Sequence, residues 1–350
     1  MRKVILFMLS IFASNANIFS QENNSDFLLI IPNLKIQHSL YSSIRFIDSR
    51  IDTLTMGNVE KGMFNKRADI IPTKSFQSQF QVILDSITDY TAKNGELLFQ
   101  LRFLNFSQVT SITTKKGYCY IRAALYGRKG EKYLKLGALD SIVFVQSSNV
   151  TTSLLANTSQ LLTDFIAGQL LNPGNERDEI VFRDIINLER LEKKKIPVYN
   201  TIEYKDGLYT SFTSFKNQVP DEQIIAGLDD KELRWVDIIT KQGNRTRVSP
   251  KKIYAVAYNG LLYVATDYGY FQLRKVENDF MFYGKGKVSA KFGEVFYASF
   301  MFGIIGGLIA SDKESIYQMK IDHINGRYIP IKVISINSRN KLTEIMKLHF

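Results

Sequence analysis

Five basic residues fall in one short stretch of the second half of the chain, where they could bind an anion. The stretch runs between Asp237 and Asp267 and has no acidic side chain. Its cations are Lys241, Arg245, Arg247, Lys251 and Lys252, with Tyr254 and Tyr258 nearby, and a glycine-rich loop adds Lys285 and Lys287. Basic groups interleaved with aromatic rings can bind phosphates or sugars. We therefore predict an anionic-ligand site here, although a charged sheet edge that discourages aggregation would carry the same residues.

The second unusual stretch is apolar. Val295 to Ala310 contains three glycines and one serine among hydrophobic residues. Its length lies between that of a buried element and that of a membrane-spanning helix. It is compatible with a core segment, with a partner-binding patch, or with membrane contact. In the last case the contacting side chains would be Phe296, Phe300, Phe302, Ile304 and Ile305.

Residues that could do catalysis are few. The three histidines, His38, His323 and His349, have no partner at metal-ligand spacing. Ser249 to Lys252 fits S-x-x-K in form, but the proline and the strand context argue against a nucleophile. We therefore predict no catalytic residue, metal site or cofactor. A secreted hydrolase acting on glycan or lipid stays as the alternative, because paired carboxylates leave no local motif.

The N-terminus has the layout of a secretory signal peptide. Arg2 and Lys3 precede the apolar run from Val4 to Phe12, and small and polar residues follow up to Ser20. Cleavage could follow Ala16 or Ser20, and we favour Ser20. No cysteine lies near the cleavage region for lipidation, and a lone Cys119 cannot form an internal disulfide. These features predict export to a bacterial periplasm, outer membrane or exterior.

The net charge of the chain indicates which chemical classes of partner to expect. The formal charge is +11, and it is +9 without Arg2 and Lys3. A basic surface attracts anions, which for an exported protein would be acidic lipid, acidic polysaccharide or, less expected, nucleic acid. A periplasmic or outer-membrane protein is another candidate partner. A role in solubility alone would also account for the charge. The sequence does not indicate the oligomeric state.

The first half reads as alternating helix and strand. One apolar stripe at helical spacing comprises Phe76, Phe80, Ile83, Leu84, Ile87 and Tyr90, after the N-cap Ser75 and before a stop at Asn94 and Gly95. Strands follow around Phe99 to Phe103, Tyr118 to Tyr126 and Tyr133 to Val145, and a second helix covers Thr151 to Leu171. Short turns favour antiparallel pairing, so we expect a two-layer antiparallel sheet with two helices on one face.

The second half reads mainly as strands. Asn259-Gly260 and Asn325-Gly326 each separate two β-rich runs, which is the strongest short-range hairpin signal. The predicted class is therefore α+β, with an N-terminal two-layer domain and a mainly antiparallel, β-rich C-terminal domain. The predicted boundaries are a signal peptide over 1–20, an α+β domain over 21–173, a helical connection over 174–197 and a β-rich domain over 198–350.

Two resemblances add a location. The order of elements from Ile44 to Leu171, with Asp48-Ser49-Arg50 and Gly57, resembles the α+β domain of YajG-type lipoproteins and of ABC-transport auxiliary components of Gram-negative envelopes. Asp206 to Ser211, with Phe215, Pro220 and the run from Tyr254 to Ala265, is similar to a domain of uncharacterised secreted Bacteroidota proteins. Neither resemblance supplies a catalytic residue. From the sequence as a whole we expect an exported, non-enzymatic envelope protein that acts as a binding or accessory module.

Overall fold

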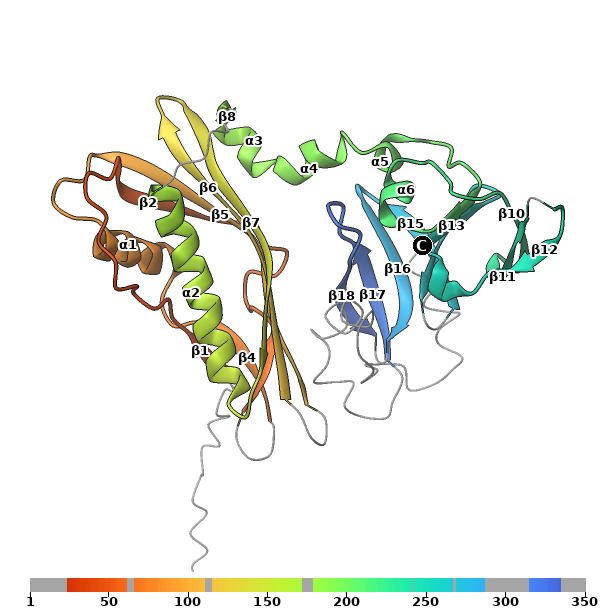
Figure 1. Cartoon of the computed structure of the whole chain (residues 1–350), viewed down its shortest axis with the longest axis horizontal. Coiled ribbons are helices and arrows are strands. Elements are labelled where there is room, and N and C mark those ends of the chain that lie inside the picture. Colours follow the sequence, from red (N-terminus) through yellow and green to blue (C-terminus); the bar gives the residue numbers. More distant parts are fainter. Residues whose placement is uncertain are drawn as a thin grey trace, which may run out of the picture.

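The computed structural model describes residues 24–61, 66–110, 115–171, 179–240, 242–266, 269–286 and 315–334. Its architecture is α+β, with a mainly β second half (Figure 1). We call the elements up to α2 the first region and those from α5 onward the second region. The predicted fold class is confirmed, and the domain boundaries stay a prediction.

A five-stranded sheet forms the body of the first region. Its strands lie in the order β2 (Tyr41–Asp48), β5 (Gly95–Thr110), β6 (Lys115–Lys129), β7 (Lys132–Gln146) and β8 (Glu179–Val181). The pairs from β5 to β8 are antiparallel, as the short turns predict, whereas β2 and β5 pair in parallel. A helix connects β2 to β5, which is the usual crossover between parallel strands. Beside this sheet, β1 (Asn24–Phe27), β4 (Lys66–Pro72) and β3 (Asn58–Lys61) make a smaller one.

Both long helices cover one face of the five-stranded sheet. They are α1 (Phe76–Ile87) and α2 (Val150–Leu171), and their apolar stripes form one buried cluster with the inward side chains of β5, β6 and β7 (Figure 1). Phe80 and Phe99 stack at its centre, with ring centroids 4.3 Å apart. The predicted two-layer arrangement is therefore present, and we call the helix-covered face the inner face.

The predicted helix stripe is one turn too long. α1 ends at Ile87, because Thr88 turns extended and its hydroxyl donates to the carbonyl of Leu84. Tyr90 lies outside the helix and is 98% exposed, so it belongs to no apolar stripe. Gly95 is not a helix stop but the first residue of β5. A Cβ there would lie 2.2 Å from the carbonyl oxygen of Leu40, so only glycine fits.

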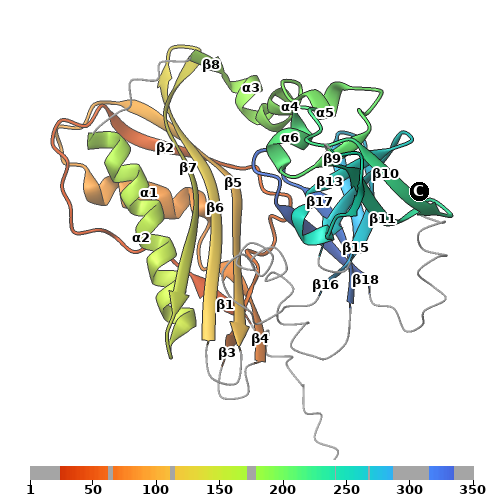
Figure 2. The same ribbon diagram turned by 45° about the vertical axis from the view of Figure 1, so that its right-hand side comes forward.

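A short connection crosses to the second region. It follows the strand β8 and consists of α3 (Phe182–Ile186) and α4 (Leu188–Lys193). Ile185 packs on Leu98, Ala124 and Tyr126 of the first sheet, on the face opposite α1 and α2, which we call the outer face. Figures 1 and 2 show this connection bridging the two regions at one end.

The second region is built from two sheets. After α5 (Pro197–Asn200), β9 (Gly207–Tyr209) and α6 (Phe212–Lys216), a three-stranded sheet contains β10 (Ile224–Asp229), β11 (Glu232–Ile239) and β12 (Arg245–Arg247). A 3-10 turn, η1 (Pro250–Lys252), leads into β13 (Ala255–Tyr258), β14 (Leu261–Thr266), β15 (Gly269–Val276), β16 (Asp279–Gly286), β17 (Ser315–Ile321) and β18 (Tyr328–Ile334). These strands and β9 form a seven-stranded sheet whose consecutive strands pair antiparallel.

Both Asn-Gly hairpins are confirmed. Asn259 and Gly260 have φ values of 52° and 73° and connect β13 to β14, as a type I′ turn requires. Asn325 and Gly326 lie in the turn between β17 and β18, and Gly326 has a φ of 75°.

Candidate functional site

The predicted basic stretch lies on β12 and η1, at the margin of the three-stranded sheet. Pairing of β12 with β11 places Arg247 opposite Asp237. The guanidinium of Arg247 lies 4.6 Å from the ring centroid of Trp235 and forms an ion pair with Asp237 at 2.5 Å. Arg247 is therefore held by the protein itself, and its charge is already compensated.

Three other cations of the stretch are uncompensated. Arg245, Lys251 and Lys252 are exposed, and no carboxylate in the described ranges forms an ion pair with them. Pro250 starts the η1 turn, which turns the two lysines outward within a few residues of the arginine. Three exposed cations thus lie between Arg245 and Lys252, on β12 and η1, without an ion-pair partner among the described residues.

The described structure does not show where the side chains of the other predicted residues lie. The backbone of Lys285 lies in β16, opposite Ile316 of β17, in the seven-stranded sheet. Lys241 and Lys287 lie outside the described residues, as does the apolar stretch with Phe296, Phe300, Phe302, Ile304 and Ile305. No helix in the described ranges is long and apolar enough to cross a bilayer.

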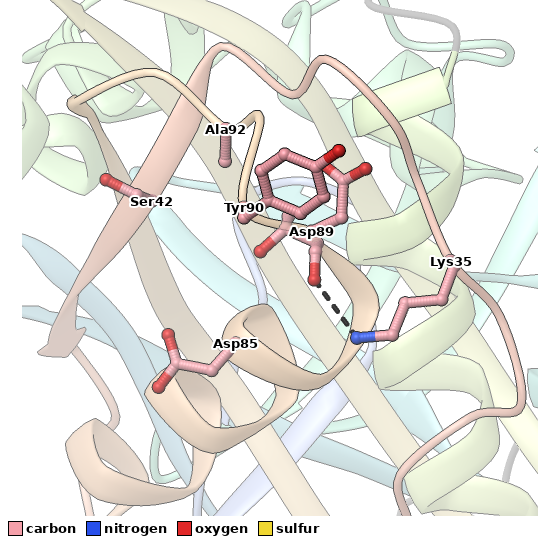
Figure 3. Close-up of a pocket in the computed structure, with 7 residues that line it drawn as sticks. Lys35, Ser42, Asp85, Asp89, Tyr90 and Ala92 are labelled. Carbon is pink, nitrogen blue, oxygen red and sulfur yellow. Dashed lines mark hydrogen bonds between the residues drawn. The ribbon is translucent and has the colours of Figure 1, made fainter.

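A shallow groove lies at the C-terminal end of α1. Figure 3 shows Tyr90 over this groove, between Lys35 and Ser42, with Asp85 and Asp89 also lining it. The ammonium of Lys35 donates to the carbonyl of Thr88 at 3.1 Å, so it caps the end of the helix. The groove therefore combines an exposed ring with two carboxylates.

Those two carboxylates do not form an acid/base pair. Asp85 accepts a hydrogen bond from Gln81 at 2.8 Å, and the Thr91 hydroxyl bonded to Asp89 lowers the pKa of that carboxyl. A general acid needs the opposite shift. In the described chain every carboxyl with a clearly shifted pKa lies below its ordinary value: Asp52, Asp89, Glu179, Glu189, Glu192, Asp221 and Asp322. Nor do three potential metal ligands converge anywhere in these ranges.

A buried polar cluster joins the outer face of the first sheet to the second region. Arg122 of β6 donates to both oxygens of Asp322, at 3.0 and 2.7 Å, across 200 residues of sequence. Asp322 is 1% exposed, and the Arg122 guanidinium outweighs its burial and lowers the pKa of that carboxyl. Tyr120 accepts a hydrogen bond from Asn325 at 3.0 Å. The β17–β18 turn is therefore locked onto β6 by a charged, bidentate contact.

The connection contributes a second ionic group. Glu192 of α4 accepts two hydrogen bonds from Arg102 of β5, at 2.8 and 2.5 Å. Its carboxylate also lies 2.7 Å from Nε2 of His323. Burial by itself would raise the pKa of Glu192, but the bonds to His323 and Arg102 outweigh it and lower the pKa to about 2. One carboxylate thus links the sheet, the connection and the β17–β18 turn.

A third ionic group alternates two lysines with two carboxylates. Lys193 lies 2.6 Å from Glu189 and 2.5 Å from Asp279, and Lys320 lies 2.8 and 3.0 Å from the same two carboxylates. Both lysines are buried. Burial opposes ionisation of Glu189, but Lys320 and Lys193 lower its pKa to about 2. Because every one of these charges is paired, the cluster is suited to holding the two regions together rather than to chemistry.

The sequence alone did not identify this cluster. Arg102 and Arg122 stand at alternate positions of strands, which is also what an exposed strand face would show. The one available signal was that Asp322 and His323 lie one residue before the Asn325-Gly326 turn, but nothing local indicates their partners. Arg122 and Asp322 are 200 positions apart in the sequence, and Glu192 and His323 are 131 positions apart.

Comparison with known proteins shows no family for this chain. No protein-family model and no curated protein matches the chain. Part of it is similar to the crystal structure of a Xanthomonas campestris protein of the DUF330 family, at 10% identity, over 42% of this chain and 95% of that one, with a TM-score of 0.26. A similarity of this size carries no argument about function, which must come from the residues themselves.

Proposed function

We propose that this is an exported, non-enzymatic envelope protein that acts as a binding or accessory module and presents a basic face to anionic ligands. The observation that carries the proposal is the set of three exposed, uncompensated cations, Arg245, Lys251 and Lys252. Acidic lipid headgroups and acidic polysaccharide share the chemistry that such a face recognises. Export itself is proposed from the N-terminal sequence pattern.

The hydrolase alternative gains no support from the described carboxyls. A glycoside hydrolase needs one carboxylic acid whose pKa is raised, facing a second carboxylate. The clearly shifted carboxyl pKa values all move downward. Three of these carboxyls, Glu189, Glu192 and Asp322, belong to the ionic groups that join the two regions.

The test is cosedimentation of the mature protein with vesicles of phosphatidylglycerol, with neutral phosphatidylcholine vesicles for reference, and pull-down on an acidic polysaccharide. We expect binding at low ionic strength that falls steeply as salt rises. Each cation near an anionic surface contributes about 1 kcal/mol, so replacing all three by glutamine should weaken lipid binding roughly a hundredfold.

The matched control removes the same charge elsewhere. Lys74, Lys93 and Lys195 are also exposed, and their triple glutamine variant has the same net charge. It should bind nearly as well as the unmodified protein. Equal losses in both variants would mean that only net charge matters, and no binding at low salt to either anion would remove the proposal.

A further inference from the structure

The three-stranded sheet of the second region has one covered side and one side that faces solvent. Val236 and Ile238 of β11 point to the covered side, where they pack with side chains of β13, β14 and β15 in one apolar cluster. Because side chains alternate along a strand, Trp235, Asp237 and Ile239 lie on the opposite side, which we call the solvent face. Figure 1 shows this sheet at the margin of the second region, away from the first region.

The pairing of β12 with β11 adds two arginines to the solvent face. Arg247 lies opposite Asp237 and Arg245 lies opposite Ile239, so both arginine side chains project on the same side of the sheet as Trp235. Both arginines are exposed, and Trp235 is partly exposed. The solvent face therefore combines the only tryptophan of the chain with two cations.

The indole of Trp235 is held close to the sheet by a glycine. Gly227 of β10 pairs with Trp235, and a Cβ at Gly227 would lie 2.2 Å from the indole Nε1. Any side chain at this position would therefore displace the ring. The guanidinium of Arg247 lies 4.6 Å from the ring centroid and also restrains it. Because the ring is positioned before a ligand arrives, little entropy is lost in ordering it on binding.

Arg247 can still bind a ligand, although Asp237 offsets its charge. Asp237 accepts a hydrogen bond from Nε, and within the described ranges the two terminal nitrogens of Arg247 form none. The Arg247 side chain is 59% exposed. A guanidinium fixed at Nε can donate its terminal N–H groups to a ligand carboxylate in the planar, bidentate geometry that arginine favours. Nearby, Arg245, Lys251 and Lys252 supply net positive charge.

We infer that the solvent face binds an acidic polysaccharide, with a sugar ring against the exposed part of the Trp235 indole and its carboxylate on Arg247. This inference rests on the proposed function and selects polysaccharide over acidic lipid as the ligand. An aromatic ring held close to a sheet, beside an oriented guanidinium, suits a ring-shaped ligand that carries a charge. Membrane contact needs apolar side chains that project from the surface, and Ile239 is the only described one on this face with a large exposed fraction.

The first test is the fluorescence of Trp235, which reports on this face alone because the chain has no other tryptophan. Titration of the full mature chain with oligogalacturonate should give a saturable change in emission that weakens as salt rises. A neutral maltooligosaccharide of the same length should give no change at the same concentration. A change with phosphatidylglycerol vesicles and none with oligogalacturonate would assign the face to lipid and overturn the inference.

The second test displaces or removes the ring without changing any charge. Gly227→Ala forces the indole from its position and Trp235→Ala removes it, and each should weaken binding to immobilised oligogalacturonate roughly tenfold. Circular dichroism verifies that each variant is folded. Tyr90→Ala is the matched control, because Tyr90 is an aromatic residue of the first region that is 98% exposed. It should bind as well as the unmodified protein.

The third test separates geometry from charge. Arg247→Lys keeps the cation but loses the planar group, so it should weaken oligogalacturonate binding several-fold and leave binding to phosphatidylglycerol vesicles unchanged. Salt-dependent binding to either anion that Gly227→Ala and Trp235→Ala leave unaffected would overturn the inference while the proposed function stands. No binding to either anion at low ionic strength would remove both.

Discussion

The two faces of the first sheet are covered by opposite chemistry. The inner face is sealed against α1 and α2 by apolar side chains, with Phe80 and Phe99 at the centre. The outer face is joined to the second region by ion pairs around Arg122 and Glu192. Apolar burial supplies free energy without direction, whereas a bidentate ion pair gains little net energy but tolerates few geometries. The difference teaches that one face stabilises the region and the other orients it.

The largest effect should come from the inner face. Phe99→Ala removes a fully buried ring and leaves a cavity, so the free energy of unfolding should fall by about 4 kcal/mol. Chemical denaturation measures this. Val82→Ala, on the exposed side of α1, should change stability very little, and an equal loss in both variants would contradict the assignment of the core.

The next effect should come from the outer face. Asp322→Ala leaves Arg122 buried without its bidentate partner, which should cost about 3 kcal/mol. Because this contact joins the regions, small-angle scattering of the variant should also show expansion, which Phe99→Ala would not produce at matched folded population. Asp140→Ala removes the more exposed partner of Arg122 and serves as control, with a smaller loss. An unchanged scattering profile in Asp322→Ala would show that the ion pair does not orient the regions.

Acid should weaken the ionic contacts between the two regions. The folded pKa values of Glu189 and Glu192 are each about 2, below the ordinary value of 4.5. A group with a lowered folded pKa stabilises the protein above its unfolded pKa, and this contribution is lost as the pH falls from about 4.5 to about 2. Glu192→Gln should therefore flatten the loss of stability across that window. The effect is smaller than that of Asp322→Ala, because both glutamates are partly exposed and solvent screens their pairs.

The smallest effect should come from the β2 edge of the first sheet, where the side chains of Gln77 and Gln81 of α1 hydrogen-bond to the strand backbone. Gln77→Ala and Gln81→Ala each remove hydrogen bonds to β2, at about 1 kcal/mol each. The double variant should also aggregate more readily, because it exposes a strand edge. Gln160→Ala is a suitable control, since the side chain of Gln160 bonds only to the exposed Asp164. Light scattering during mild heating separates the two variants. Equal aggregation would show that the glutamines do not protect the edge.

The sequence predicted the inner face well and the outer face poorly. The apolar stripe from Phe76 to Ile87 and the alternation around Phe99 correctly indicated a helix layer on a sheet. Tyr90 was wrongly included, because helical spacing continues in the sequence after hydrogen bonding by Thr88 has ended the helix. The hydrogen bonds of Gln77 and Gln81 to the backbone of β2 were not predicted, because they depend on how α1 packs against that strand.

The anion-binding site stays a prediction, and only part of its geometry could be anticipated from the sequence. The basic stretch was visible in the sequence because its cations are close together along the chain. The contacts of Arg247 with Trp235 and Asp237 could not be seen in the sequence, because they depend on the pairing of β12 with β11. Among the predicted anion-binding residues whose side chains the structure describes, Arg245, Lys251 and Lys252 are therefore the exposed, uncompensated set.

What the sequence determined by itself were the features encoded within a few residues: the helix period, the strand alternation and the two Asn-Gly hairpins. Each arises from local backbone preference and from the spacing of apolar side chains, which need no distant partner. Only the tertiary structure decided which polar residues are buried and which partners they bind. Arg122 and Asp322 are ordinary charged residues until folding brings them together across 200 positions, because the cost of burying a charge is met only by a partner that local sequence does not reveal.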